Sequence, residues 1–278
     1  MRSNEIWLTP YGGLANRMRA VNSMVEFTRE TAIPLNVVWF ANFELNAPFS
    51  SLFIPIQDSM VSIEESKPYS RFLYNSPRRN NLWIPYITSR LYFDRIIYYD
   101  EFIRLRDNNL LGDTLRSGGR IFVESCYDFG HASEALARNF VPTQRLQEAV
   151  CNFVDANFAS RTVGVHIRRT DNTLAIEQSP IKLFMDAMQR EIQAFPDVKF
   201  YVASDDEKEK ELLKNRFGGR IITRSSDCRR NCIEGIESAV EDMYILSCTA
   251  KIYGSFYSSF SDIAAKLRGA EIEVLSII

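Results

Sequence analysis

The spacing of apolar and polar residues predicts a strand, a turn and a helix at the start of the chain. Residues 6–10 form a short apolar run, and a Gly-Gly pair follows it as a turn. Between residues 14 and 32 the apolar positions recur every three or four residues, which is the spacing of one helix face. Residues 35–40 form a second apolar run. A strand, a helix and a strand in this order favour a parallel sheet.

Strand and helix patterns alternate regularly from residue 160 onward. Apolar runs of strand length are separated by stretches with helical spacing of their apolar positions. This alternation is typical of a doubly wound α/β sheet. The expected strands are 162–167, 198–204, 220–223, 251–255 and 271–275, and the expected helices are 180–195, 205–217, 236–249 and 258–268.

The middle of the chain has a less regular pattern. Residues 41–118 show no clear period and are rich in aromatic residues, Asn, Ser and Pro. Within them we expect 75–86 to be a surface loop or an inserted segment, with the shaping of an acceptor pocket as the functional alternative. Strand character returns at 120–125, and an amphipathic helix is expected at 143–158.

The composition is that of a globular protein, and the length suits two smaller α/β domains or one large one. The 278 residues are 46% hydrophobic and 24% charged. We place the domain boundary at residue 159, which gives domains 1–159 and 160–278. The net charge of −2 argues against a nucleic-acid partner. No stretch approaches the ~20 consecutive apolar residues of a membrane-spanning helix.

The cysteines and the N-terminus favour a cytoplasmic protein. The first residues lack the charged and apolar regions of a secretory leader. The number of cysteines is odd, so we expect reduced thiols. Peripheral attachment to the inner membrane is the alternative location. Cys228 and Cys232 frame a short polar loop without a second ligand pair, so they are interpreted as incidental thiols and not as a zinc site.

Polar residues follow three of the expected strands in the second domain. Because ligands of doubly wound sheets bind beyond the carboxyl ends of the strands, these residues make a plausible nucleotide site. The three groups are His166 to Asp171, Ser204 to Asp206, and Gly254 to Ser259.

The two adjacent arginines are expected to have different roles. Side chains alternate along a strand, so Arg168 and Arg169 point to opposite sides. Arg168 can direct two donors at a diphosphate, with a structural salt bridge as the alternative. Arg169 is expected to pair with an acid, Asp171 being one candidate, or to meet solvent. Beside two arginines, His166 should be uncharged, either as a ligand contact or as a buried side chain bonded to the backbone.

The other two strand ends each allow two interpretations. The hydroxyl-rich turn before residue 259 suits a phosphate at a helix N-terminus, or simple capping of that helix by Ser255 or Ser258. Of Asp205 and Asp206, one is expected to cap the following helix, and the other to accept hydrogen bonds from a base or ribose.

Several common catalytic motifs are absent from the sequence. No phosphate-binding Gly-x-x-x-x-Gly-Lys-Ser/Thr loop, no Gly-x-Gly-x-x-Gly turn and no Gly-x-Ser-x-Gly elbow occurs. Asp205-Asp206 is not the Asp-x-Asp pattern of metal-dependent sugar transferases. The chain has only two histidines, so a His-rich metal site is excluded. We therefore expect no metal site.

Four segments together resemble GDP-fucose-dependent fucosyltransferases. "HIRRTDN" (166–172) is similar to the His-x-Arg-Arg-x-Asp motif of these enzymes, especially the α1,6 type, and "FYVASDD" (200–206) is similar to their next segment. "EDMYILSCTAKIYGSFYSSFSDIA" (241–264) resembles their third motif. "YGGLANRM" (11–18) is similar to the opening turn of the α1,2 and protein O-fucosyltransferases.

The resemblance implies a GT-B-like fold with two Rossmann-like domains facing a cleft. It also implies an inverting transfer of fucose from GDP-fucose to a glycan hydroxyl without an obligatory metal, and no cofactor beyond this donor. By position, Arg168 would hold the diphosphate. His166, Asp205 and Asp206 would line the nucleotide pocket. The remaining substrate contacts implied are Asp242 toward the guanosine, Ser255, Phe256 and Ser258 around the phosphates and base, and Asn16 and Arg17 from the first domain.

The sequence departs from the α1,6 pattern just after the first motif. Asn172 stands where those enzymes carry Lys, and the following loop is about one residue shorter. Glu177 is the nearest counterpart of their proposed base, and Asp171 is a second candidate to orient or deprotonate the acceptor. Two alternatives stay open: a transferase for another nucleotide sugar, and a non-catalytic relative that binds a nucleotide or a glycan.

Overall fold

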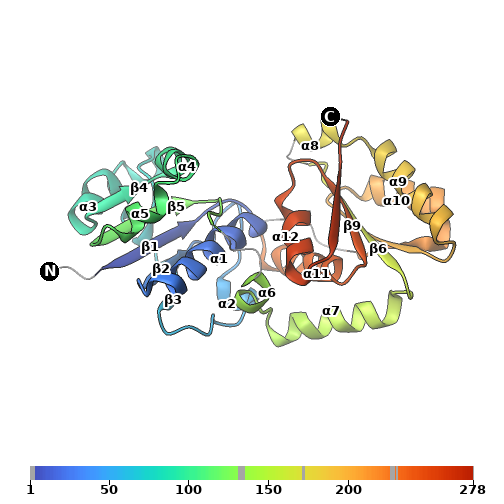
Figure 1. Cartoon of the computed structure of the whole chain (residues 1–278), viewed down its shortest axis with the longest axis horizontal. Coiled ribbons are helices and arrows are strands. Elements are labelled where there is room, and N and C mark those ends of the chain that lie inside the picture. The colour runs from blue at the N-terminus through green and yellow to red at the C-terminus, as the bar shows by residue number, and fades with distance from the viewer. Residues whose placement is uncertain (1–3, 131–134, 171–172, 226–228, 230, 278) are drawn as a thin grey trace. The chain divides into compact units, whose positions relative to one another are not determined.

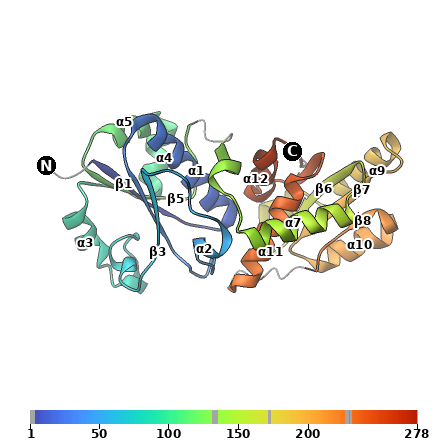
Figure 2. The same ribbon diagram turned by 90° about the horizontal axis from the view of Figure 1, so that it is seen from below.

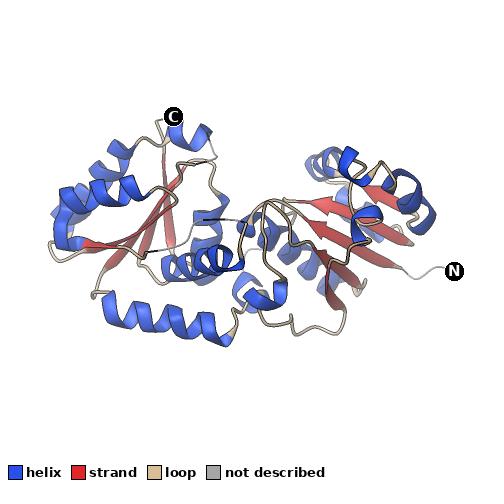
Figure 3. Cartoon of the chain, turned by 180° about the vertical axis from the view of Figure 1, so that it is seen from behind, coloured by secondary structure: helices blue, strands red, loops and turns tan. Residues whose placement is uncertain are grey.

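The computed structural model describes residues 4–130, 135–170, 173–225, 229 and 231–277. The chain forms two compact units, one mainly of residues up to Val141 and one mainly of residues from Pro142 onward. Each unit contains a five-stranded parallel sheet with helices alongside it (Figures 1 and 3). The predicted α/β class with two doubly wound sheets is confirmed.

The first sheet combines three predicted strands with two that the pattern did not indicate. Its strand order is β3-β2-β1-β5-β4. The predicted strands are β1 (Glu5–Pro10), β2 (Leu35–Trp39) and β5 (Arg120–Ser125), and the predicted helix is α1 (Leu14–Thr31). The additional strands are β3 (Val61–Glu65), which is largely exposed, and β4 (Arg95–Ile97), which has three residues.

Aromatic residues build the layer that covers one face of this sheet. The Trp7 ring stacks on the Tyr74 ring with centroids 5.0 Å apart, and Tyr92 and Phe93 meet its edge. Trp7 projects to the opposite face of β1 from the buried Ile6 and Leu8. The remaining helices of this unit are α2 (Phe49–Leu52), α3 (Pro85–Tyr92), α4 (Tyr99–Asp107), α5 (Leu111–Arg116) and α6 (Leu136–Asn139), with 3-10 turns at Ser70–Phe72 and Arg79–Asn81. The segment 75–86, expected to be a loop, therefore contains a 3-10 turn and the start of α3.

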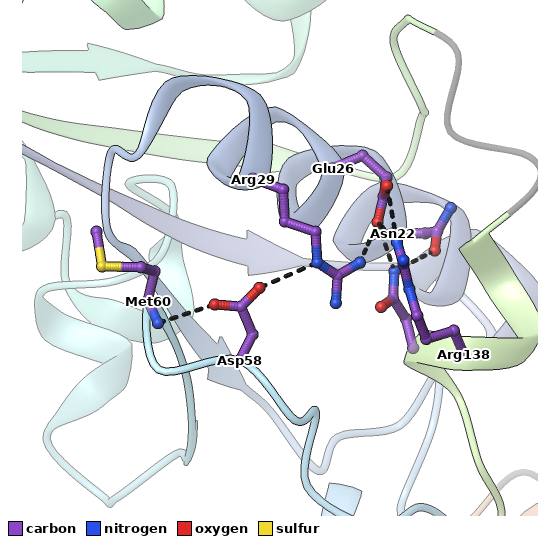
Figure 4. A network of polar contacts seen from close by, with 7 residues as sticks. Asn22, Glu26, Arg29, Asp58, Met60 and Arg138 are labelled. Atoms are coloured by element: carbon purple, nitrogen blue, oxygen red, sulfur yellow. Dashed lines mark hydrogen bonds and ion pairs between the residues drawn. The ribbon is translucent and has the colours of Figure 1, made fainter.

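A polar network ties α1 to two distant segments of the first unit (Figure 4). Glu26 accepts hydrogen bonds from Arg29 and, at 3.0 Å, from Arg138 in α6. Arg29 also bonds to Asp58 at 3.0 Å, and Asp58 accepts the Met60 N–H at 3.0 Å. Burial raises the pKa of Glu26, but the hydrogen bonds and the Arg29 charge outweigh it, so the pKa is lowered overall. The network is structural and holds α1 in place.

The second sheet contains all five predicted strands in the order β10-β9-β6-β7-β8. In this order the strands on either side of β6 connect in opposite directions, so the gap between β6 and β9 is a topological switch point. The strands are β6 (Thr162–Ile167), β7 (Lys199–Ser204), β8 (Ile221–Ile222), β9 (Lys251–Ser255) and β10 (Glu271–Leu275).

Helices of the second unit mostly lie where the sequence predicts them. Val163, Val165 and Ile167 of β6 pack in the core with Phe184 and Met188 of α9. The short helix α8 falls in a segment expected to be a polar loop. The helices are α8 (Thr173–Gln178), α9 (Ile181–Ala194), α10 (Glu207–Phe217), α11 (Ile233–Ser247) and α12 (Ser259–Arg268). Across both units, no helix among the described residues is long and apolar enough to cross a bilayer.

Helix α7 (Gln144–Asn157) belongs to the second compact unit. It lies beside the second sheet (Figure 2), and its Phe153 ring meets the Tyr201 ring of β7 with centroids 5.6 Å apart. The division between the two compact units therefore falls between Val141 and Pro142, before α7. The boundary that the sequence suggested, residue 159, lies after this helix. The buried face of α7 explains the difference, because it packs on the strands that follow it.

Candidate functional site

The ends of β6 and β9 are joined at the switch point of the second sheet. The Arg168 N–H donates to Ser255 Oγ at 3.0 Å, and this hydroxyl donates to the His166 carbonyl at 3.3 Å. Ser255 is only 1% exposed. Gly254 has no side chain, and a Cβ there would lie 2.6 Å from Ser261 Oγ in α12. The start of α12 can therefore lie against the end of β9, where Ser255 accepts the Arg168 backbone N–H.

Arg168 is held by an ion pair and still has exposed surface. Its Nη1 lies 2.8 Å from Asp205 Oδ2, while 19% of the arginine side chain and 11% of the aspartate side chain are exposed. The structural salt bridge weighed for Arg168 is thus present. The carboxylate orients the guanidinium, and the exposed part is where an anionic ligand would reach it.

Asp205 and Asp206 have separate tasks. Asp205 accepts hydrogen bonds from the Arg169 N–H at 2.7 Å and from Thr170 Oγ1 at 2.7 Å, which orders the turn after β6. Asp206 accepts the Lys208 N–H at 2.9 Å and caps α10. The prediction that one of the two acids caps this helix is confirmed. The contact of the other with a base or ribose stays a prediction.

Arg169 points away from Arg168, as the strand alternation predicts. Its Nε lies 2.6 Å from Glu209, its Nη2 donates to the Ser179 carbonyl at 2.9 Å, and 9% of its side chain is exposed. Glu209 is the acid that pairs with Arg169 in the structure, and the candidate Asp171 lies outside the described residues. Glu209 belongs to α10, so its approach depends on the fold of the sheet and not on local spacing.

His166 is buried and uncharged at neutral pH. Burial and, to a smaller degree, the Arg168 charge lower its pKa to about 4, against the opposing effect of Asp205. The ring stacks on Phe260 with centroids 4.8 Å apart, and its Nδ1 lies 3.5 Å from Ser258 Oγ. The predicted neutral state is confirmed. Sequence reasoning missed Phe260, which carries no signal except its place on the first turn of α12.

The N-terminus of α12 lacks a side-chain cap. Ser258 occupies the capping position but makes no capping hydrogen bond, and the Ser255 hydroxyl serves β6 instead. The expected alternative of capping by either serine is therefore wrong. Tyr257 has a left-handed φ of 54°, and the Phe256 N–H donates to Ser179 Oγ at 2.7 Å, which fixes the turn before the helix. A helix end of this kind favours an anion.

Asp242 lies in a polar cluster on the face of the second sheet. Its Oδ1 accepts the Tyr201 hydroxyl at 2.7 Å and Arg224 Nη1 at 2.8 Å, and Arg224 also pairs with Glu241. Burial and the nearby Asp242 raise the pKa of Tyr201 well above its usual value. Sequence reasoning missed Tyr201 and Arg224; the only available signal was the place of Arg224 just after a strand. The contact of Asp242 with guanosine stays a prediction.

Arg17 is buried inside the first unit and supports its backbone. The side chain is 0% exposed and donates to the Gly12 carbonyl at 2.8 Å, to Asn42 Oδ1 at 2.9 Å and to the Phe40 carbonyl. It also packs over the Trp39 ring. This corrects the expectation that Arg17 faces a substrate, because a cation with these acceptors and no exposed surface is structural.

Asn16 and Glu177 keep accessible surface. Asn16 is half-buried beside Gly12, where a φ of +81° would strain any side chain and a Cβ would lie 3.0 Å from the Asn16 amide nitrogen. The Gly12 N–H donates to Glu44 at 3.0 Å. Glu177 is exposed on α8. Among the described residues, no three His, Cys, Asp or Glu side chains are grouped to hold a metal.

Solved fucosyltransferases share this fold. The α-1,6-fucosyltransferase NodZ, in a crystal soaked with GDP-fucose, is 20% identical with a TM-score of 0.65 over 95% of this chain and 92% of its own; another matched NodZ structure is from Bradyrhizobium. A variant of Arabidopsis thaliana FUT1 in complex with GDP is 16% identical, with a TM-score of 0.69 over 98% of this chain and 70% of its own.

POFUT1 in its apo form is 12% identical, with a TM-score of 0.59 over 100% of this chain and 99% of its own. No protein-family model and no curated protein sequence matches the chain. The likeness to these structures establishes the GT-B-like fold that the motifs implied. At such identities it leaves the chemistry to be argued from the site.

Proposed function

We propose that this protein transfers fucose from GDP-fucose to a hydroxyl group of a glycan. The observation that carries the proposal is Arg168, oriented by Asp205 at the switch point and adjacent to the uncapped N-terminus of α12. NodZ, which has the same fold, was soaked with GDP-fucose. A cation and a helix N-terminus together suit the diphosphate of such a donor.

The site fits the charge that develops when GDP leaves. The bond between the anomeric carbon and the β-phosphate oxygen breaks, so negative charge builds on the phosphate and positive charge on the sugar. Arg168 and the first N–H groups of α12 would stabilise the phosphate, and each such donor contributes about 3–4 kcal/mol in comparable sites. These groups serve the role that a divalent cation has in other transferases, so we propose that the transfer is metal-independent.

The neutral ring of His166 would form one wall of the nucleotide pocket. Uncharged imidazole offers one donor and one acceptor, and the stacked Phe260 fixes the plane of the ring. Asp205 would act mainly by positioning Arg168. The further nucleotide contacts that belong to this proposal are those of Asp206, Asp242, Ser255, Phe256 and Ser258, with Asn16 on the first unit.

The acceptor oxygen would attack the anomeric carbon from the face opposite the departing GDP, which inverts the configuration. Its proton would pass to a carboxylate. Glu177, exposed on α8, is one candidate, and Asp171, outside the described residues, is the other. A dissociative transition state needs little help from this base, because the sugar is already electron-deficient when the hydroxyl arrives.

The cytoplasmic location belongs to the same proposal. Cys126, Cys151 and Cys248 are free thiols, which suits a reducing compartment.

The test is incubation of the full chain with GDP-fucose, a panel of glycans and EDTA. We expect GDP release that depends on one class of glycan, persists with EDTA, and gives a product whose anomeric configuration by NMR is opposite to that of the donor. GDP binding without fucose release under every condition would instead identify a non-catalytic relative. Turnover only with another nucleotide sugar would identify the second alternative, since an arginine binds any diphosphate.

A further inference from the structure

The segment 67–92 has a charge unlike that of the rest of the chain. It contains five Lys or Arg residues and no Asp or Glu. The other residues include 28 basic and 35 acidic side chains, a net charge of −7. All five cations of the segment are exposed: Lys67, Arg71, Arg78, Arg79 and Arg90. Among these five cations, only Arg78 forms an ion pair with a residue that the structure describes, Glu124.

The same segment exposes large apolar side chains next to these cations. Helix α3 lies beside β4 at the margin of the first unit (Figure 1). Pro85 and Ser89 of this helix are buried. Its exposed residues are Tyr86, Ile87, Arg90 and Leu91. We call the exposed set the α3 surface: Arg79, Leu82 (73% exposed), Trp83 (61%), Tyr86 (56%), Ile87 (64%), Arg90 and Leu91 (71%).

The backbone before α3 is strained in a way that displays two of these side chains. Leu82 and Trp83 have left-handed φ values of 53° and 60°. Bulky residues rarely adopt this conformation, and here two do so in succession while their side chains gain no burial. The inner side of the segment is firmly held, because Tyr74 and Tyr92 pack on Trp7 and Asn81 donates to the Ser76 carbonyl at 2.9 Å.

We propose that the α3 surface attaches the protein to an anionic lipid bilayer. Leu82, Ile87 and Leu91 would enter the acyl boundary, and Trp83 and Tyr86 would lie at the headgroup level, where amphipathic rings are favoured. Arg79 and Arg90 would face the lipid phosphates, with the other cations of the segment adding long-range attraction. The absence of acidic side chains from 67–92 favours an anionic bilayer over a protein partner of mixed charge. The proposal does not depend on fucosyl transfer.

The test uses the full chain with large unilamellar vesicles. Wild-type protein should co-sediment with vesicles of phosphatidylglycerol and phosphatidylcholine, much less with phosphatidylcholine alone, and less at about 0.5 M NaCl. Tryptophan emission should shift to the blue on binding. Trp83 is the exposed reporter, since Trp39 is buried and Trp7 is half-buried.

Two double variants separate the charge from the apolar contact. Arg79→Glu with Arg90→Glu should weaken partitioning by about tenfold or more. Leu82→Asn with Trp83→Asn should weaken it to a similar degree and leave the melting temperature unchanged or higher, because Asn tolerates a left-handed φ. The matched controls are Lys214→Glu with Arg216→Glu for charge and Phe43→Ser, at an 81% exposed position, for apolar area.

Several results would overturn the proposal. These are failure of the wild-type chain to bind anionic vesicles, equal binding to neutral vesicles, and equal loss in the control variants. A Trp83-dependent dimer in light scattering without lipid would assign the surface to self-association. A Trp83 emission shift with a soluble glycan, but none with vesicles, would assign it to an acceptor site.

Discussion

Each unit has an arginine near the end of its first strand, and the two side chains have opposite environments. Arg17 lies on α1, the helix that follows β1; it is fully buried and donates to two carbonyls and an amide oxygen. Arg168 follows β6, is 19% exposed, and is held by the carboxylate of Asp205. Burial lowers the pKa of Arg17 to about 10, against the opposing effect of Glu44.

The difference teaches how one residue type can serve structure in one unit and, under the proposed function, ligand binding in the other. Neutral oxygens around Arg17 complete its hydrogen bonding and leave no surface for a ligand. The carboxylate of Asp205 beside Arg168 orients the guanidinium, and part of the Arg168 side chain stays exposed. Burial and the kind of acceptor, more than position in the fold, therefore decide the role.

The largest expected effect is on turnover. Arg168→Ala should reduce fucosyl transfer several hundred-fold, since a key donor to the leaving phosphate contributes about 3–4 kcal/mol. Its free energy of unfolding should change much less, because Asp205 keeps its hydrogen bonds from the Arg169 N–H and Thr170 Oγ1. Steady-state rates and denaturant melts measure the two quantities. The control is Arg216→Ala, an exposed arginine on α10. Near-normal turnover of Arg168→Ala would remove the proposed role.

Arg17→Met should lower the stability of the protein and leave GDP binding intact, which is the reverse of the result expected for Arg168→Ala. Three acceptors lose their donor, so the free energy of unfolding should fall by about 3–4 kcal/mol. The affinity for GDP, measured by calorimetry on the folded fraction, should stay within about twofold, a change well under 1 kcal/mol. A stable variant that has lost GDP binding would show that Arg17 contacts the nucleotide after all.

The buried His166 predicts a pH dependence of stability. Its folded pKa of about 4 lies below the value near 6.5 in an unfolded chain, so the unfolded state binds the extra proton. Stability from this group is complete above about pH 6.5 and is lost as the pH falls toward 4, by on the order of 2–3 kcal/mol. His166→Gln should flatten this part of the curve relative to wild type. Parallel curves for the two proteins between pH 4 and 6.5 would contradict the buried neutral ring.

The smallest expected effect concerns the Asp242 cluster. Tyr201→Phe removes one buried hydrogen bond to Asp242, and Arg224 still satisfies that carboxylate. The free energy of unfolding should fall by about 1 kcal/mol. The measurement is a urea titration, with Tyr253→Phe, which loses a bond to Glu191, as the comparison. A loss of several kcal/mol from Tyr201→Phe alone would mean that the whole cluster depends on this hydroxyl.

The strands β6, β7 and β9 of the second sheet could be predicted because each is a buried apolar run followed by a helical pattern. The strands β3 and β4 could not, since one is an exposed edge and the other has three residues. The aromatic layer was also beyond local pattern, because Trp7 meets Tyr74 from a distant part of the chain.

In the candidate site, too, the local sequence pattern predicted some features and others depended on the tertiary structure. Alternation along β6 correctly separated Arg168 from Arg169, and the neighbouring charges correctly indicated a neutral His166. The partners of these residues required tertiary structure: Glu209 approaches from α10 and Phe260 from α12. The burial of Arg17 could not be foreseen, because a motif gives the identity of a residue and not its exposure.

The most direct test of the account is a set of thermal melts of the wild-type chain and Arg168→Ala with GDP, UDP and ADP. We predict that only GDP raises the wild-type midpoint, by the equivalent of about 2.7 kcal/mol when the ligand is at about 100 times its Kd. Arg168→Ala should lose most of that shift. Equal shifts with all three nucleotides, or an undiminished GDP shift in Arg168→Ala, would contradict a GDP site at the ends of β6 and β9.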